Sequence, residues 1–127
     1  MGTYLKLFVM VLGMAGCLVF VDCAANGTAS FFRPPYTRNA CGRKHTGTLI
    51  AVAGNSTWEK GRTCGRKYSV QCIGAINHAP HPCKPVKVVV EIVDHCPHCH
   101  ETLSLSEDAF AKIANVDAGI VKIEYSE

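Results

Sequence analysis

The sequence predicts a small, disulfide-stapled all-β domain with one short helix. Short runs of β-branched and aromatic residues alternate with Gly, Pro and Asn, which is typical of strands joined by turns. Eight cysteines in 127 residues indicate a disulfide framework or a metal site. A length of 127 residues with no internal repeat leaves room for one compact domain.

Five segments have the character of strands. In several of them apolar and polar residues alternate, which indicates one buried and one solvated face. The most apolar run lies around Val88, and its alternation places Val86, Val88, Val90 and Ile92 on the inner face. The predicted strands are Ala29–Phe32, Leu49–Ala53, Lys67–Ile73, Val86–Val93 and Ile120–Tyr125.

The predicted helix begins after Ser106. Serine is a favourable N-cap, and Glu107 and Asp108 put negative charge in the first turn, where the helix dipole stabilises it. The next apolar side chains form one stripe at i, i+3 and i+4, namely Phe110, Ile113 and Ala114. We expect the helix to end at Asn115. We expect this helix to close one end of a small barrel.

The N-terminus predicts secretion. Lys6 precedes fifteen uncharged, mostly apolar residues, 7–21, and small residues follow, which is the layout of a signal peptide. The run is shorter than the roughly twenty residues of a membrane-spanning helix. We expect cleavage after Ala24 or Ala25, with residues 1–24 as the signal peptide and residues 25–127 as the mature domain.

The mature domain retains six cysteines: Cys41, Cys64, Cys72, Cys83, Cys96 and Cys99. An even number in a secreted chain predicts three disulfides, with fifteen connectivities open in principle. Two sequons, at Asn26 and Asn55, are candidate glycosylation sites.

The densest cluster of reactive side chains is His95-Cys96-Pro97-His98-Cys99-His100. Its imidazoles and thiols could bind zinc or copper, but a second ligand pair of the usual spacing is missing elsewhere. Redox activity is a further alternative, although thioredoxin-type motifs open a helix within a βαβ unit. A structural Cys96–Cys99 disulfide is the favoured interpretation, so no metal or cofactor is predicted.

Carboxylates are the next candidates, because glycosidases place two of them around one bond. Asp94 ends an apolar strand and is the best-placed acid; alternatively, it starts a turn and accepts hydrogen bonds from local backbone amides. Glu101, Glu107 and Asp108 are near in sequence, but the last two belong to the helix start. These residues form no convincing catalytic set, and the sequence predicts a protein that is not an enzyme.

Charge is unevenly distributed along the chain. The net charge of +3 is too small for a dedicated nucleic-acid binder. Residues 33–67 carry eight basic residues and Glu59, a local +7, whereas residues 91–127 carry eight acids and two lysines, a local −6. The basic segment, with Tyr36 and Trp58 beside it, could meet an acidic wall polymer, an anionic membrane or an acidic receptor. Alternatively, it pairs with the acidic half.

Four motifs follow one another along the mature chain: Phe32–Cys41, Trp58–Tyr68, Val93–Pro97, and Leu105–Phe110 with the residues to Gly119. Together they resemble plant natriuretic peptides, which belong with expansin-like, family-45-endoglucanase-like and barwin-type domains. The resemblance covers essentially the whole mature chain. It implies a six-stranded double-psi β-barrel and the disulfides Cys41–Cys64, Cys72–Cys83 and Cys96–Cys99.

Two departures from the wider family bear on activity. Expansins have a second, carbohydrate-binding domain that this chain is too short to encode. Endoglucanases and many expansin-like proteins have an essential Asp before the Leu-Ser that leads into the helix, where this chain has Ser104. Serine cannot donate the proton that glycoside hydrolysis needs. Asp94 matches the other Asp of expansin-like domains and would act alone.

The resemblance implies a secreted, non-catalytic signal of the plant apoplast that affects water and ion balance under stress. Its active region would match Arg33 to Tyr68, presented as a monomer to an unidentified receptor at the plasma membrane. The alternatives are a wall module that binds or loosens acidic polysaccharide without hydrolysis, and a barwin-like defence protein. The expected receptor- or polysaccharide-binding residues are Tyr36, Thr37, Arg38, Trp58, Arg62, Arg66 and Asp94.

Overall fold

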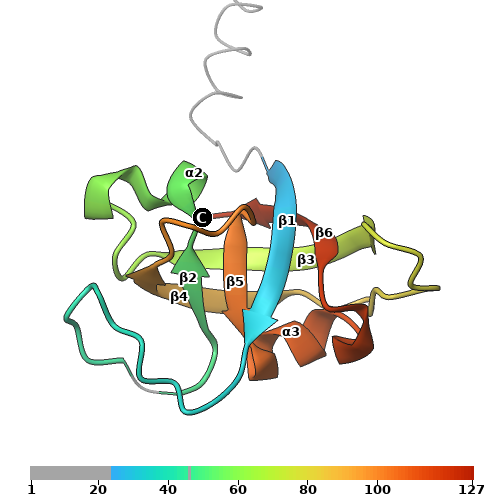
Figure 1. Cartoon of the computed structure of the whole chain (residues 1–127), viewed down its shortest axis with the longest axis horizontal. Coiled ribbons are helices and arrows are strands. Elements are labelled where there is room, and N and C mark those ends of the chain that lie inside the picture. Colours follow the sequence, from blue (N-terminus) through green and yellow to red (C-terminus); the bar gives the residue numbers. More distant parts are fainter. Residues whose placement is uncertain (1–23, 46) are drawn as a thin grey trace, which may run out of the picture.

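The computed structural model describes residues 24–45 and 47–127, in which six strands close into a barrel (Figure 1). Around the barrel the order is β1-β5-β2-β4-β3-β6. The pairs β1–β5 and β2–β4 are parallel, and the other neighbours are antiparallel. The strands are β1 (Ala25–Phe32), β2 (Ile50–Ala53), β3 (Lys67–Ala75), β4 (Val88–His95), β5 (Leu103–Ser106) and β6 (Val121–Ser126).

Two short α-helices lie at opposite ends of the strands β2 and β5 (Figure 1). Helix α3 (Glu107–Ile113) begins where the sequence predicted, and the Ser106 hydroxyl accepts a hydrogen bond from the Ala109 amide at 3.2 Å. It ends two residues before Asn115, which instead caps the 3-10 turn η2 (Val116–Ala118). The prediction of a single helix was wrong, because α2 (Asn55–Trp58) is one turn and too short to show a helical period.

The core fills the barrel and is closed at one end by α3. Phe110, Ile113 and Ala114 are fully buried, as the apolar stripe predicted, and the Phe110 ring packs 5.0 Å from that of Phe31. Most of the remaining core consists of apolar strand residues: Ala29, Val90, Ile92, Leu103, Leu105, Val121 and Ile123. Removing this apolar surface from water is the main stabilising contribution to the domain.

All five predicted strands are present with shifted ends, but β5 was not among the predicted segments. Its four residues, Leu-Ser-Leu-Ser, alternate between the core and the outer face over too short a stretch to stand out. Val86 was wrongly placed inside: it is 52% exposed, because the β3–β4 ladder reaches only to Val88 and the Val86 amide turns back to the Lys84 carbonyl.

Three disulfides connect the strands and loops: Cys41–Cys64, Cys72–Cys83 and Cys96–Cys99. These are the pairs that the resemblance implied, and such bridges persist in oxidising compartments. The predicted signal peptide, apart from Ala24, lies outside the described residues. Within residues 24–45 and 47–127, the structure has no helix with the length and apolar character to cross a membrane.

Candidate functional site

The connection between β1 and β2, described at residues 33–45 and 47–49, contacts α3 and β4, and we call it the β1–β2 loop. Its start contacts α3, where the Arg33 guanidinium lies 3.4 Å from the Glu107 carboxylate. Its middle reaches β4, where the Cys41 amide donates to the Val93 carbonyl at 3.1 Å. Its end returns to α3, because the Thr48 carbonyl accepts a hydrogen bond from Ser106.

A β-bulge turns Asp94 toward this loop. Strict alternation after Val88, Val90 and Ile92 would place Asp94 inside the barrel. The β2–β4 register shifts between Ala51 and Val52, so that Ala51 pairs with Ile92 but Val52 pairs with Asp94. The extra residue in β4 moves Asp94 to the outer face, an effect that bulges commonly have near functional sites.

Asp94 is 7% exposed and ties the β1–β2 loop to β4. One carboxylate oxygen accepts from Arg38 Nε at 2.6 Å, and the other accepts from the Ala40 amide at 2.9 Å. These partners lie more than fifty positions away in the sequence. The alternative of a local turn-starting Asp is therefore not what this structure shows.

Asp94 and Ser104 belong to one row on the outer face, because both pair with Val52 from opposite sides of β2. Two strand spacings, about 9.6 Å, separate their backbone positions. Two such positions could carry the pair of carboxyl groups of an inverting glycosidase, which lie roughly 6.5–9.5 Å apart. The Ser104 hydroxyl lies 3.4 Å from that of Ser30, so the row continues onto β1 as hydroxyl groups.

An aromatic pair stands beside Asp94. The Trp58 indole stacks on the His95 imidazole, with the ring centroids 4.5 Å apart and the planes 4° from parallel. His95 Nε2 lies 2.8 Å from Asn55 Oδ1, and Asn55 Nδ2 donates to the Pro97 carbonyl at 2.8 Å. Trp58 was predicted to be a binding residue but His95 was not, because stacking between residues nearly forty positions apart leaves no local signal in the sequence.

The two sequons lie on exposed residues. Asn26 lies on β1 opposite Glu124, and Asn55 opens α2 with its side-chain amide engaged as described above. Glycosylation at either residue stays a prediction.

Several basic residues of the predicted active region are paired with acids. Arg33 and Arg38 contact Glu107 and Asp94, and Arg66 lies 3.4 Å from Glu59 and 3.7 Å from Glu127. Charge pairing between the halves thus accounts for part of the local +7. The remaining cations form no ion pair with any described residue, and we call them the free cations: Arg43, Lys44, Lys60, Arg62 and Lys67.

Tyr36 and Thr37 lie where the β1–β2 loop passes α3. The Tyr36 hydroxyl accepts from the Asp108 amide at 3.3 Å, and its ring meets Phe32 edge-on with centroids 5.5 Å apart. Removal from water raises the pKa of Tyr36. Thr37 is exposed beside it. Tyr36 therefore anchors the loop to α3, a contact that was not predicted from the sequence.

The backbone around Lys60 is strained. Glu59 and Lys60 have left-handed φ values of 47° and 55°, and Gly61 follows at 88°. Consecutive non-glycine residues in this region are costly and persist where the surrounding structure holds them. Thr63, 1% exposed, donates to the Trp58 carbonyl at 3.1 Å, and Cys64 is bridged to Cys41. The strained turn thus holds two of the free cations, Lys60 and Arg62.

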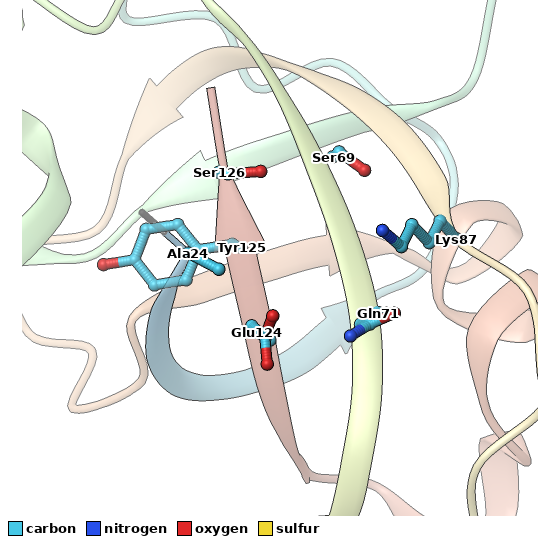
Figure 2. Close-up of a pocket in the computed structure, with 7 residues that line it drawn as sticks. All are labelled: Ala24, Ser69, Gln71, Lys87, Glu124, Tyr125 and Ser126. Atoms are coloured by element: carbon cyan, nitrogen blue, oxygen red, sulfur yellow. The ribbon is translucent and has the colours of Figure 1, made fainter. Parts of the chain in front are cut away.

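A separate polar pocket of about 300 Å³ lies on the β3–β6 face, across the barrel from β2 and β5 (Figure 2). Its lining residues are Ala24, Ser69, Gln71, Lys87, Glu124, Tyr125 and Ser126. Figure 2 shows the Lys87 side chain directed toward β3, with Glu124 on the neighbouring strand β6. None of the predicted site residues lines this pocket.

The histidine-rich turn does not assemble a metal site among the described residues. Cys96 and Cys99 are joined to each other, and no group of three His, Cys, Asp or Glu side chains converges within residues 24–45 and 47–127.

Comparison with known proteins identifies the family. A family model described as "Lytic transglycolase" matches residues 50–125. An EG45-like domain containing protein from Citrus jambhiri is 44% identical over 131 residues, which covers 100% of this chain and 99% of the relative. The chain belongs to the EG45-like domain family. EG45-like domain containing protein 2 from Arabidopsis thaliana is 41% identical over 122 residues, 95% of this chain and 94% of that protein.

Solved structures show the same fold at lower identity. An expansin from Clavibacter michiganensis, solved as a point mutant in complex with cellohexaose, has a TM-score of 0.63 and 21% identity. The match covers 80% of the EG45-like chain but only 48% of the expansin. A Streptomyces papain inhibitor matches with a TM-score of 0.55 and 20% identity, over 85% of this chain and 98% of the inhibitor. With these matches, the predicted double-psi β-barrel and the expansin-like resemblance are confirmed.

Proposed function

We propose that this EG45-like protein is a secreted, non-hydrolytic signal that engages an acidic receptor surface at the plasma membrane and affects water and ion balance. The observation that carries the proposal is the strained turn at Lys60. Strain held in place by a disulfide and a buried threonine is typical of functional segments. The turn presents Lys60 and Arg62 to solvent without acidic partners among the described residues.

The outer face of β2 and its neighbours supports a role without hydrolysis. The row that could hold two carboxylates at a glycosidase-like spacing has Asp94 at one position and Ser104 at the other. Asp94 is itself neutralised by Arg38 and bonded to the Ala40 amide. Ser104 has no carboxyl proton to donate, so the row lacks the second acid that glycoside hydrolysis needs.

The test uses wall-free leaf protoplasts and the oxidised mature protein, residues 25–127. We expect the protein to change protoplast volume at constant osmolarity, and the variant Lys60→Glu/Arg62→Glu to lose at least tenfold in potency. The matched control Lys112→Glu/Lys122→Glu reverses two cations on α3 and β6 and should keep full potency. A volume change of equal potency with both variants would contradict the proposal.

A second candidate function is binding of wall polysaccharide, and one observation favours it. The exposed Arg38, held by the buried Asp94, and the half-buried Trp58–His95 stack offer a hydrogen-bond donor and an aromatic face, a set suited to a sugar. The structurally similar expansin was solved with cellohexaose. Sedimentation with cellulose or pectin should then be weakened severalfold by Asp94→Asn and unchanged by Glu124→Gln, which lies across the barrel. Absence of sedimentation with the parent protein would exclude this candidate.

A further inference from the structure

The turn between β4 and β5 carries a disulfide that differs from the other two. Cys96 and Cys99 are only three positions apart, whereas the other pairs are separated by 11 and 23 positions. Pro97 and His98 between them are exposed, and both cysteines are half-buried. A bridge on an exposed turn can be reached by a dissolved thiol, which is the first requirement for exchange.

The short loop also means that this bridge restrains the unfolded chain least. The loop-closure entropy that a disulfide removes from the unfolded chain grows with the number of positions it encloses, which is three here and 23 for Cys41–Cys64. Opening the Cys96–Cys99 bridge therefore costs the fold the least of the three. Opening it therefore leaves most of the stabilisation from the three disulfides in place.

The surroundings of the bridge favour a cysteine that leaves as a thiolate. His95, His98 and His100 put three imidazoles within one residue of a cysteine. An imidazole that donates a hydrogen bond to a departing sulfur stabilises it, and a stabilised sulfur is the better leaving group in exchange. Strand β5, and not a helix, follows the turn, so the histidines are the cationic or hydrogen-bonding groups nearest to the cysteines in the sequence.

The turn is connected to the candidate site by named contacts. The Cys96 amide donates to the Ala53 carbonyl at 2.9 Å, and the Pro97 carbonyl accepts from Asn55. Asn55 in turn contacts His95, which stacks on Trp58. A change in the conformation of the 96–99 turn would therefore alter the environment of the Trp58 indole.

We propose that Cys96–Cys99 is a thiol–disulfide exchange site whose partner is a low-molecular-weight thiol, and that its reduction loosens the Trp58–His95 stack. The thiolate of the partner attacks one bridge sulfur and forms a mixed disulfide, and the other cysteine leaves as a thiolate. A second partner thiolate then attacks the partner's sulfur in the mixed disulfide. The products are the partner's disulfide and two protein thiols, after transfer of two electrons and uptake of two protons.

The proposal is tested by equilibrating the mature protein in buffers with defined ratios of reduced to oxidised glutathione. Differential alkylation and mass spectrometry report each cysteine pair. Trp58, the only tryptophan, reports the stack by fluorescence. We expect Cys96–Cys99 to have a reduction equilibrium constant at least tenfold larger than the other pairs, about 30 mV for two electrons. Trp58 emission should change with the same midpoint. A constant equal to or below those of the other pairs, or unchanged emission, overturns the proposal.

Two variants separate exchange from a general loss of structure. Cys96→Ser/Cys99→Ser should keep the emission of the reduced protein at every glutathione ratio. His98→Ala should slow the exchange at least threefold, whereas His78→Ala, an exposed histidine outside the cluster, should leave the rate unchanged. Equal rates for both histidine variants would show that the flanking imidazole does not activate the bridge.

Discussion

The two sides of the barrel differ in the features that lie on them. The wall formed by β1, β6 and β3 consists of antiparallel ladders with one register shift, between Cys72 and Gly74, and holds the pocket of Figure 2. The side formed by β2 and β4 has a bulge, the overlying β1–β2 loop, two of the three disulfides and the strained turn at Lys60. The loop-covered side has two consecutive left-handed non-glycine residues, Glu59 and Lys60, whereas the three strands of the wall have none. Such strain is common in functional segments, so the predictions below compare the two sides.

The largest effect that tests this contrast comes from the disulfides. We expect Cys41→Ser/Cys64→Ser to lower the free energy of unfolding by about 3.4 kcal/mol and Cys72→Ser/Cys83→Ser by about 2.8 kcal/mol. Cys96→Ser/Cys99→Ser should cost about 1.6 kcal/mol. Urea unfolding of the three variants measures these values. A reversed order would show that the long bridge does not stabilise the loop-covered side through chain entropy.

The next effect compares a buried and an exposed ion pair on the same side. Asp94→Ala removes two hydrogen bonds to a nearly buried carboxylate and should cost about 2 kcal/mol. Glu59→Gln removes the exposed contact with Arg66 and should cost less than about 0.5 kcal/mol. Both changes are read by urea unfolding at neutral pH. Equal costs would mean that Asp94 does not clamp the loop to β4.

Features of the structure were predictable when the residues that determine them are close together in the sequence. The helix start at Ser106 and the strands around Val70, Val90 and Ile123 follow from local capping and alternation, so they were predictable. Strand β5 was not, because four residues carry too short a period. The closed strand order and disulfide pairs came from resemblance, since they join segments far apart in the chain.

In the candidate site, too, contacts between residues far apart in the sequence were not predictable. Asp94 and Trp58 were identified from sequence as reactive or aromatic residues next to strands and turns. The bulge that turns Asp94 outward, its partner Arg38 and the His95–Trp58 stack depend on which segments meet in space. Arg66 was predicted to be a binding residue but lies between two acids, a pairing that residue type alone cannot reveal.

A smaller effect tests the strained turn directly. Lys60→Gly should raise the free energy of unfolding by about 1 kcal/mol, because glycine adopts a left-handed backbone without the steric cost of a Cβ atom. Lys67→Gly, in the extended strand β3, should instead lower it by about 0.5–1 kcal/mol. Urea unfolding checks both. If Lys60→Gly is destabilising, the turn stores no strain and the argument for a functional segment loses its support.

The smallest expected effect is a change in the free energy of unfolding at alkaline pH, caused by the half-buried tyrosines. Burial raises the pKa of Tyr68 and Tyr125 on the wall, and that of Tyr36 on the loop-covered side, above 10.0. The folded state therefore holds these phenolic protons more tightly than the unfolded chain. The resulting stability is fully present below pH 10 and is lost as the pH rises through the folded-state pKa values. Between pH 9 and about 11.5, the free energy of unfolding of Tyr68→Phe/Tyr125→Phe should therefore fall less than that of the parent protein. The lysines are the same in both proteins, so their titration does not contribute to the difference. Parallel pH profiles for parent and variant would show that the wall tyrosines do not couple ionisation to folding.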